Sequence, residues 1–163
     1  MFYGCSSQRE LMSHIRRACD VISQRNVPVG VKMLSETCAA ETGLCTAVDK
    51  YEPEGRGAFQ FDSEGFKDTK SRFIGHYPEI TDKILRELGI NWASVEFEML
   101  EYAPLLGAVF CRAKYYLVPY PIPLTRQGRA EYWKKWYNST AGKGTPEHYM
   151  DMSARYLGDD VEL

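Results

Sequence analysis

The chain of 163 residues is long enough for one domain with its own hydrophobic core. Its apolar content of 44% and aromatic content of 13% predict a folded protein rather than a disordered one. A formal net charge of −2 argues against a nucleic-acid binder, and no apolar run reaches the roughly 18 residues that a membrane span needs. We therefore expect a single domain over residues 1–163, with frayed ends at 1–6 and 159–163.

The cysteines and the N-terminal sequence argue against further classes of protein. The five cysteines are odd in number and scattered, with no C-x-x-C pair. Buried free thiols are therefore a better interpretation than a disulfide framework or a zinc site, and we expect no metal and no cofactor. The start of the chain, MFYGCSSQRE, lacks a basic stretch followed by an apolar core, so no secretory signal is visible.

Helical periodicity dominates the first part of the chain. The sequence SQRE at residues 7–10 is a capping box, which predicts a helix to about Gln24. A second helix is expected over 27–42, because Pro28 suits a first helical position and Gly43 suits a left-handed C-terminal cap. Its apolar stripe follows steps of four, three and four: Val27, Val31, Leu34 and Cys38.

One carboxylate on this second helix lies on the apolar stripe. Glu41 comes three residues after Cys38, whereas Glu36 lies about 180° from Val27 and is expected to face solvent. A glutamate against apolar neighbours has its charged form disfavoured, so its pKa rises toward the range that a general acid needs. The alternative is that Glu41 caps the last turn or pairs with a lysine or arginine.

The middle of the chain combines a polar loop with further helices. Residues 44–57 form a loop or a small hairpin in this prediction. A short helix is expected from 62 to 69, and another over 78–88 with Leu85 among its inward residues. Apolar residues alternate with glutamates over 95–99, which predicts a short extended piece, with a helical turn as the alternative.

The last part of the chain contains the most apolar segment. Pro104 begins a helix that is apolar nearly all round, and we expect it to be the central buried helix of a bundle. Arg112 and Lys114 on this helix are expected to reach outward by their stems. A helix containing Trp133 and Tyr137 on one face follows a proline-rich connector, and Thr145-Pro146-Glu147 begins the last helix. The predicted fold class is mainly α.

Three short motifs occur in a characteristic order. They are Glu41-Thr42, then Ala58-Phe59-Gln60, and near the end Tyr137-Asn138-Ser139. In order and spacing they resemble the lysozyme-like superfamily, most closely lytic transglycosylases and related bacteriophage cell-wall-cleaving domains. The family pattern is Glu-Ser, later Gly-Leu-Met-Gln, and finally Tyr-Asn-Ala-Gly. The resemblance covers about residues 27–145, and this chain departs from the pattern by Thr for Ser, Phe for Met and Ser-Thr-Ala-Gly for Ala-Gly.

The resemblance implies a fold and a reaction. The expected fold is an α+β lysozyme-like one, in which a helical bundle surrounds a central helix and a small β-element lines a cleft. The implied reaction is cleavage of the β-1,4 bond between N-acetylmuramic acid and N-acetylglucosamine in peptidoglycan. Glu41 would be the catalytic acid, with the Tyr137 hydroxyl placed near it. The implied substrate-binding set is Thr42, Ala58, Gln60, Phe61 and Asn138, with Thr42 orienting the helix end.

The mechanism that the resemblance implies has two versions. In a lytic transglycosylase one glutamate suffices, and the muramoyl C6 hydroxyl attacks to give an anhydro sugar. In a lysozyme a water attacks, and a second carboxylate takes part. Asp49 and Asp62 are the candidates for that second carboxylate. Phe61, Trp133 and Trp136 offer aromatic faces for sugar stacking, although core packing is the favoured interpretation of the two tryptophans.

The resemblance also implies a setting. The protein would be made in the host cytoplasm without a signal peptide and would be phage-encoded and virion-associated, acting on the bacterial cell wall. Its partners would be the peptidoglycan glycan strand and other virion proteins, with no nucleic acid and no membrane span. The alternative function is that of a non-catalytic structural or adaptor protein of the virion on the same fold, because a fold does not fix a function.

Overall fold

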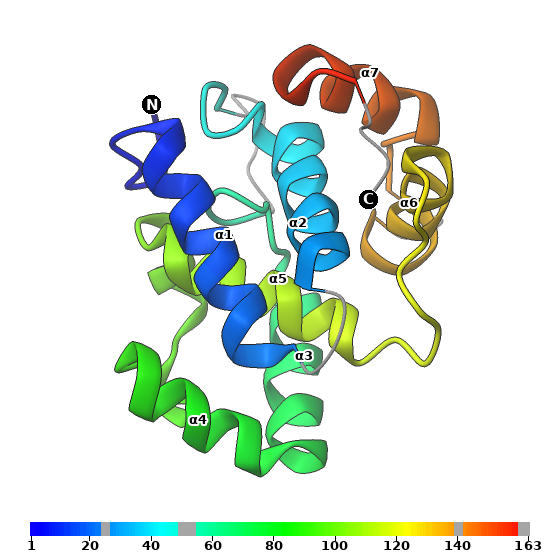
Figure 1. Cartoon of the computed structure of the whole chain (residues 1–163). Coiled ribbons are helices and arrows are strands. Elements are labelled where there is room, and N and C mark those ends of the chain that lie inside the picture. The colour runs from blue at the N-terminus through cyan, green and yellow to red at the C-terminus, as the bar shows by residue number, and fades with distance from the viewer. Residues whose placement is uncertain (24–26, 49–54, 139–141, 160–163) are drawn as a thin grey trace.

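The computed structural model describes residues 1–23, 27–48, 55–138 and 142–159. Within these residues the chain is mainly helical and has no strand, which confirms the mainly-α fold class (Figure 1). The elements in chain order are α1 (Gln8–Ile22), α2 (Val27–Thr42), α3 (Ser63–His76), α4 (Pro78–Leu88), the 3₁₀ turns η1 (Trp92–Ser94) and η2 (Phe97–Glu101), α5 (Pro104–Tyr116), α6 (Arg126–Trp133), the π-helical turn η3 (Lys134–Asn138) and α7 (Pro146–Leu157).

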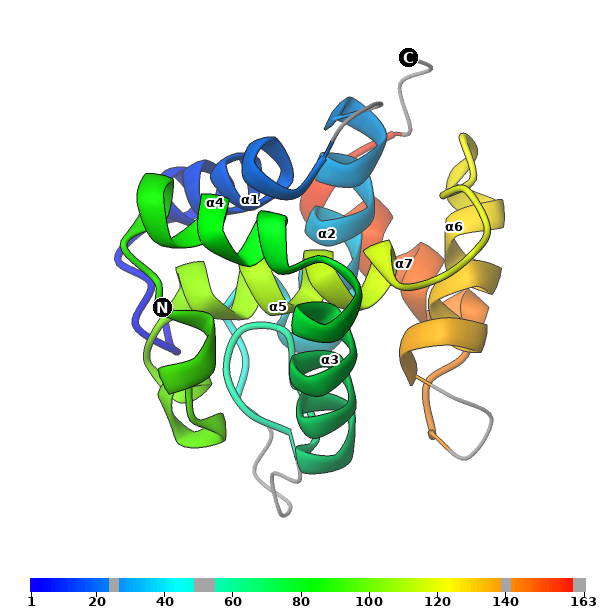
Figure 2. The same ribbon diagram turned by 90° about the horizontal axis from the view of Figure 1, so that it is seen from below.

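Helix α5 is the central helix, as predicted. It packs against α1, α2 and α3, and Figure 2 shows it crossing the middle of the molecule with α1 and α4 along one side. Four successive residues, Ala108, Val109, Phe110 and Cys111, are fully buried. Four consecutive buried positions cover every face of a helix, so α5 has to be apolar all round and its neighbours have to surround it.

A second group of helices, α2, α6 and α7, packs beside this centre (Figure 1). Glu36 of α2 is 2% exposed in this packing, so the expectation that it faces solvent is wrong. Its carboxylate accepts hydrogen bonds from Arg129 Nε at 2.7 Å, Arg126 Nε at 3.1 Å and Tyr149 Oη at 3.0 Å. Because α6 and α7 cover the side of α2 opposite α5, both sides of this helix are buried.

The segments at 55–61 and 97–101 form turns. Residues 55–61 hold a single antiparallel pair, in which the N–H of Arg56 donates to Phe61 at 2.7 Å and the N–H of Phe61 donates back at 3.1 Å. Over 95–99 the backbone is extended only at Val95 and Glu96, and the alternative of a helical turn holds from Phe97 on, where η2 turns Phe97 onto Phe66 and buries Leu100. Asp49 lies outside the described residues.

The ends of several helices agree with the sequence signals. The Ser7 side chain accepts from the N–H of Glu10 and caps α1, and Gly89 ends α4 in the left-handed conformation. Helix α3 is longer than the predicted 62–69, since its apolar residues continue to the buried Phe73. Leu85 is 47% exposed on α4, so its predicted inward position is wrong.

The N-terminal residues, which were expected to fray, pack against the end of α2. The N–H of Phe2 donates to Cys45 at 2.8 Å, and Tyr3 and Cys5 are buried. All five cysteines are buried free thiols, as predicted. Among the described residues, no helix combines the length and the apolar character needed to cross a membrane.

Candidate functional site

Five of the predicted site residues meet around one pocket of about 80 Å³. They come from three separate segments: the end of α2, the turn at 55–61, and η3. The lining residues are Glu41, Gln60, Phe61, Asp62, Lys114, Tyr137 and Asn138. Thr42 and Ala58 do not line it, and both are buried behind its wall.

The end of α2 places Glu41 at the pocket. Gly43 has φ +54°, which a glycine adopts without strain, and a Cβ added there would lie 2.6 Å from the Tyr156 hydroxyl. The turn therefore ends the helix at Thr42, and Glu41 stays on its last turn. A helix that continued would carry the chain past the pocket.

The Glu41 carboxyl is largely shielded from solvent. It is partly exposed, and its Oε1 accepts a hydrogen bond from the indole Nε1 of Trp133 at 3.0 Å. Burial raises the pKa of the Glu41 carboxyl from its ordinary 4.5 to about 7, against smaller lowering effects of the Trp133 hydrogen bond and of the Lys114 charge. A large fraction of Glu41 is therefore protonated at neutral pH and can donate a proton.

Lys114 is a pocket residue that the sequence analysis missed. Its ammonium donates to the Tyr137 carbonyl at 3.2 Å and lies 4.4 Å from the centre of the Tyr137 ring. The expectation that Lys114 reaches outward is wrong, because η3 and the N-terminal end of α3 cover this side of α5. Burial lowers the pKa of Lys114, although nearby Asp62 and Glu41 oppose that shift. The sequence did contain a signal that Lys114 belongs to a site, because it is a lysine within a helix that is otherwise apolar nearly all round.

The turn at 55–61 presents Gln60 to the pocket. Gln60 has φ +46°, and its side-chain amide donates to the Gly57 carbonyl at 2.8 Å. Gly57 has φ +72°, and a Cβ there would collide with the Leu100 carbonyl. The glycine thus lets the turn lie flat against η2, and the left-handed Gln60 directs the chain back toward α3.

Thr42 and Ala58 join α2 to this turn. The Thr42 hydroxyl donates to the Ala58 carbonyl at 2.8 Å and also lies 3.2 Å from the Cys38 carbonyl. Thr42 is 2% exposed and Ala58 is fully buried, so neither is placed to touch a ligand. Their contact fixes Glu41 and Gln60 relative to each other, which agrees with an orienting role for Thr42.

Replacing Thr42 by alanine is expected to lower the free energy of unfolding by about 1–3 kcal/mol, because a buried carbonyl loses its hydroxyl donor. Urea denaturation measures this change. Thr42→Ser keeps the hydroxyl and is the matched control, with an expected loss of less than about 1 kcal/mol. Equal losses in the two variants would show that the hydrogen bond is not the cause.

Tyr137 and Asn138 lie on the π-helical turn η3, a conformation that is frequent at functional sites. The Tyr137 hydroxyl, which the resemblance implied to lie near Glu41, donates to the Phe59 carbonyl at 2.7 Å. The side-chain oxygen of Asn138 accepts from Lys134 Nζ at 2.9 Å. Tyr137 thus holds the 55–61 turn, and its ring forms part of the pocket wall.

Asp62 places a second carboxylate in the pocket. Its Oδ1 accepts from the N–H of Gly65 at 2.6 Å and caps α3. This capping contact fixes the carboxylate in the pocket wall beside Lys114. Of the two tryptophans considered for sugar stacking, Trp133 is 1% exposed in the core, whereas Trp136 is partly exposed, with its ring 5.9 Å from that of Tyr120.

Replacing Lys114 by methionine is expected to raise the pKa of Glu41 further above about 7, because the nearby positive charge favours the ionised carboxylate. The pH dependence of the Glu41 side-chain carboxyl ¹³C chemical shift measures this pKa. Lys67→Met, which removes the same charge from an exposed position, is expected to leave the pKa unchanged. A lower pKa in Lys114→Met would contradict this electrostatic assignment.

A comparison with known proteins finds no matching family model, no matching curated protein and no matching solved structure.

Proposed function

We propose that this protein is a peptidoglycan-cleaving glycosidase of the lysozyme or lytic transglycosylase type, with a lysozyme-like fold and with Glu41 as its general acid. One observation carries the proposal: a glutamate at a helix end, with a pKa raised to about 7, lines a pocket together with Gln60, Tyr137 and Asn138. These residues belong to the three motifs that resemble the family, and they are far apart in the sequence.

The proposed reaction begins with proton transfer from Glu41 to the glycosidic oxygen between N-acetylmuramic acid and N-acetylglucosamine. The resulting Glu41 carboxylate, which the Lys114 charge stabilises, then takes a proton from the attacking group. That group is the muramoyl C6 hydroxyl in the transglycosylase version and a water in the lysozyme version. Asp62 is the carboxylate that could assist in the second version, because it lines the same pocket.

The substrate in this proposal is the bacterial glycan strand, with Gln60 and Asn138 as polar contacts to it. The exposed ring of Tyr120 and the partly exposed Trp136 next to it offer a place for sugar stacking outside the pocket. We further propose a phage-encoded, virion-associated protein that acts on the cell wall, with other virion proteins as partners.

A specific observation favours the alternative of a non-catalytic virion adaptor on the same fold. The pocket of about 80 Å³ is smaller than the ~300–1,000 Å³ that ligand pockets usually have, and Lys114 occupies part of it. The Glu41 carboxyl is also already bonded to Trp133. In this alternative the pocket is closed by the chain's own side chains, and Glu41 has a structural role.

Digestion of purified peptidoglycan tests the two proposals against each other. The enzyme proposal predicts soluble muropeptides, and mass spectrometry of their ends distinguishes anhydromuramic products from reducing ones. Walls of several chemotypes are needed, together with a circular dichroism spectrum that shows a folded sample. No release from any wall by the folded protein would contradict the enzyme proposal and leave the adaptor.

A further inference from the structure

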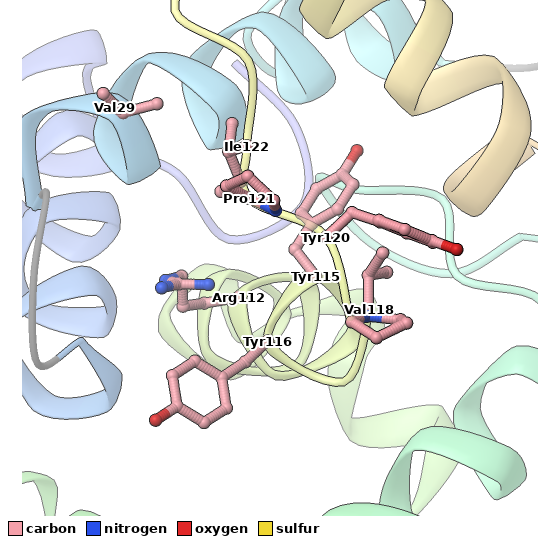
Figure 3. A pocket seen from close by; sticks show the side chains of 9 residues that line it. Val29, Arg112, Tyr115, Tyr116, Val118, Tyr120, Pro121 and Ile122 are labelled. Carbon is pink, nitrogen blue, oxygen red and sulfur yellow. The ribbon is translucent and has the colours of Figure 1, made fainter.

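A second pocket lies away from Glu41, between the start of α2, the end of α5 and the connector that follows α5. Its volume is about 350 Å³, which is within the range of small-molecule sites. Figure 3 shows side chains from these three segments around one space. Its walls include Val29, Tyr115, Tyr116, Tyr120, Pro121 and Ile122.

Arg112 provides the charge in this pocket. Its side chain is directed between α1 and α2 rather than into solvent, with a residue exposure of 7%, so the prediction that it reaches outward is wrong. Its Nε and Nη2 lie 3.3 and 3.0 Å from the hydroxyl of Ser23, and its guanidinium carbon lies 5.3 Å from the centre of the Tyr116 ring. Of five N–H groups, three have no hydrogen-bond partner among the described residues.

The other buried arginines show what Arg112 lacks. Arg126 and Arg129 share the carboxylate of Glu36, at distances of 2.7 to 3.1 Å. Arg112 has a hydroxyl and an aromatic ring in place of a carboxylate, within the part of the chain that the structure describes. Burial lowers its pKa, but a guanidinium remains charged at neutral pH. A buried cation with unused donors beside an open pocket is suited to an anionic ligand.

The remaining wall indicates which anion fits. Valine, isoleucine, proline and tyrosine side chains form most of the lining, and Arg112 is the one cationic side chain among the described lining residues. A carboxylate carries one charge and matches a guanidinium in a two-bond contact, whereas a phosphate dianion would leave a charge without a counterpart. We propose that this pocket binds a small carboxylate with an aromatic or branched apolar body, through Arg112 and the tyrosine walls.

This proposal does not depend on the Glu41 site, and binding of phenylacetate tests it directly. Methyl NMR of Val29, Val118 and Ile122 locates the ligand, because these side chains line the pocket (Figure 3). We expect their resonances to shift with phenylacetate, and we expect phenylacetamide and inorganic phosphate to bind at least about tenfold more weakly. Equal affinities for phenylacetate and phenylacetamide, or no shift with phenylacetate, would overturn the proposal.

Two variants and a matched control complete the test. Arg112→Gln is expected to weaken phenylacetate binding by at least about tenfold, and Arg17→Gln, which removes an exposed charge from α1, is expected to leave it unchanged. Tyr120→Ala keeps the charge and changes a side chain that is 60% exposed, so its folding is not in question. We expect it to weaken binding severalfold by removing a wall. Wild-type affinity in both Arg112→Gln and Tyr120→Ala would overturn the proposal.

Discussion

Glutamine in place of Glu41 is expected to slow muropeptide release by at least about 10²–10⁴-fold, because the amide cannot donate the proton that the leaving sugar needs. The reason is specific to this position, since Glu41 is the pocket carboxyl whose pKa is raised to about 7. Quantitative chromatography of the soluble products measures the rate. Glu131→Gln, an exposed change on α6, is the matched control and should retain the wild-type rate.

The stability of Glu41→Gln separates loss of chemistry from loss of fold. The folded-state pKa of Glu41 is raised, so ionisation of this carboxyl lowers the free energy of unfolding of the protein. This loss of stability is absent below about pH 4.5, grows as the pH rises and is complete above about pH 7. Its size is on the order of 1–3 kcal/mol for a partly exposed group. The variant should therefore be at least as stable as the wild type at pH 8, and marked unfolding there would contradict this account of Glu41.

The change Glu36→Gln is expected to reduce the free energy of unfolding by about 3–5 kcal/mol. It removes the carboxylate that both Arg126 and Arg129 bind, and it does so where Arg129 is fully buried. The amide is nearly the same size as the carboxyl, so the loss reflects charge rather than packing. Chemical denaturation at pH 7 measures the effect.

The position of Glu36 gives this prediction a consequence for the site. The buried network joins α2 to α6 and α7, and Glu41 and its hydrogen-bond donor Trp133 lie on α2 and α6. A folded Glu36→Gln sample should therefore also show a changed pKa for Glu41. Glu131→Gln is again the control, with an expected change in stability within about 0.5 kcal/mol. A similarly small effect of Glu36→Gln would contradict the importance of the network.

The helices were largely predictable, because their signals are local. Pro28 and Gly43 mark the two ends of α2, and Pro104 marks the start of α5. The partial burial of Glu41 also followed from its place on the stripe, because that stripe faces the interior. These inferences need only the residues within one helix.

The sequence-based predictions were wrong where segments distant in the sequence decide which helix faces are covered. The helical pattern of α2 assigned Glu36 to solvent, yet α6 and α7 cover it with residues that lie 90 to 113 positions later in the sequence. Lys114 and Arg112 were expected outside because lysine and arginine usually are, and the covering segments again lie far away in the sequence. The turn at 55–61 depends on a close approach of Gly57 to Leu100 that no local pattern reveals.

The central claim is that the pocket holds Glu41 protonated near neutral pH so that it can act as an acid on peptidoglycan. The pH dependence of muropeptide release tests this claim most directly. The account predicts a constant rate below about pH 6 and a tenfold fall per pH unit above about pH 7, as Glu41 loses its proton. A rate that is maintained to pH 9, a fall already complete by pH 5, or no release at any pH would contradict it.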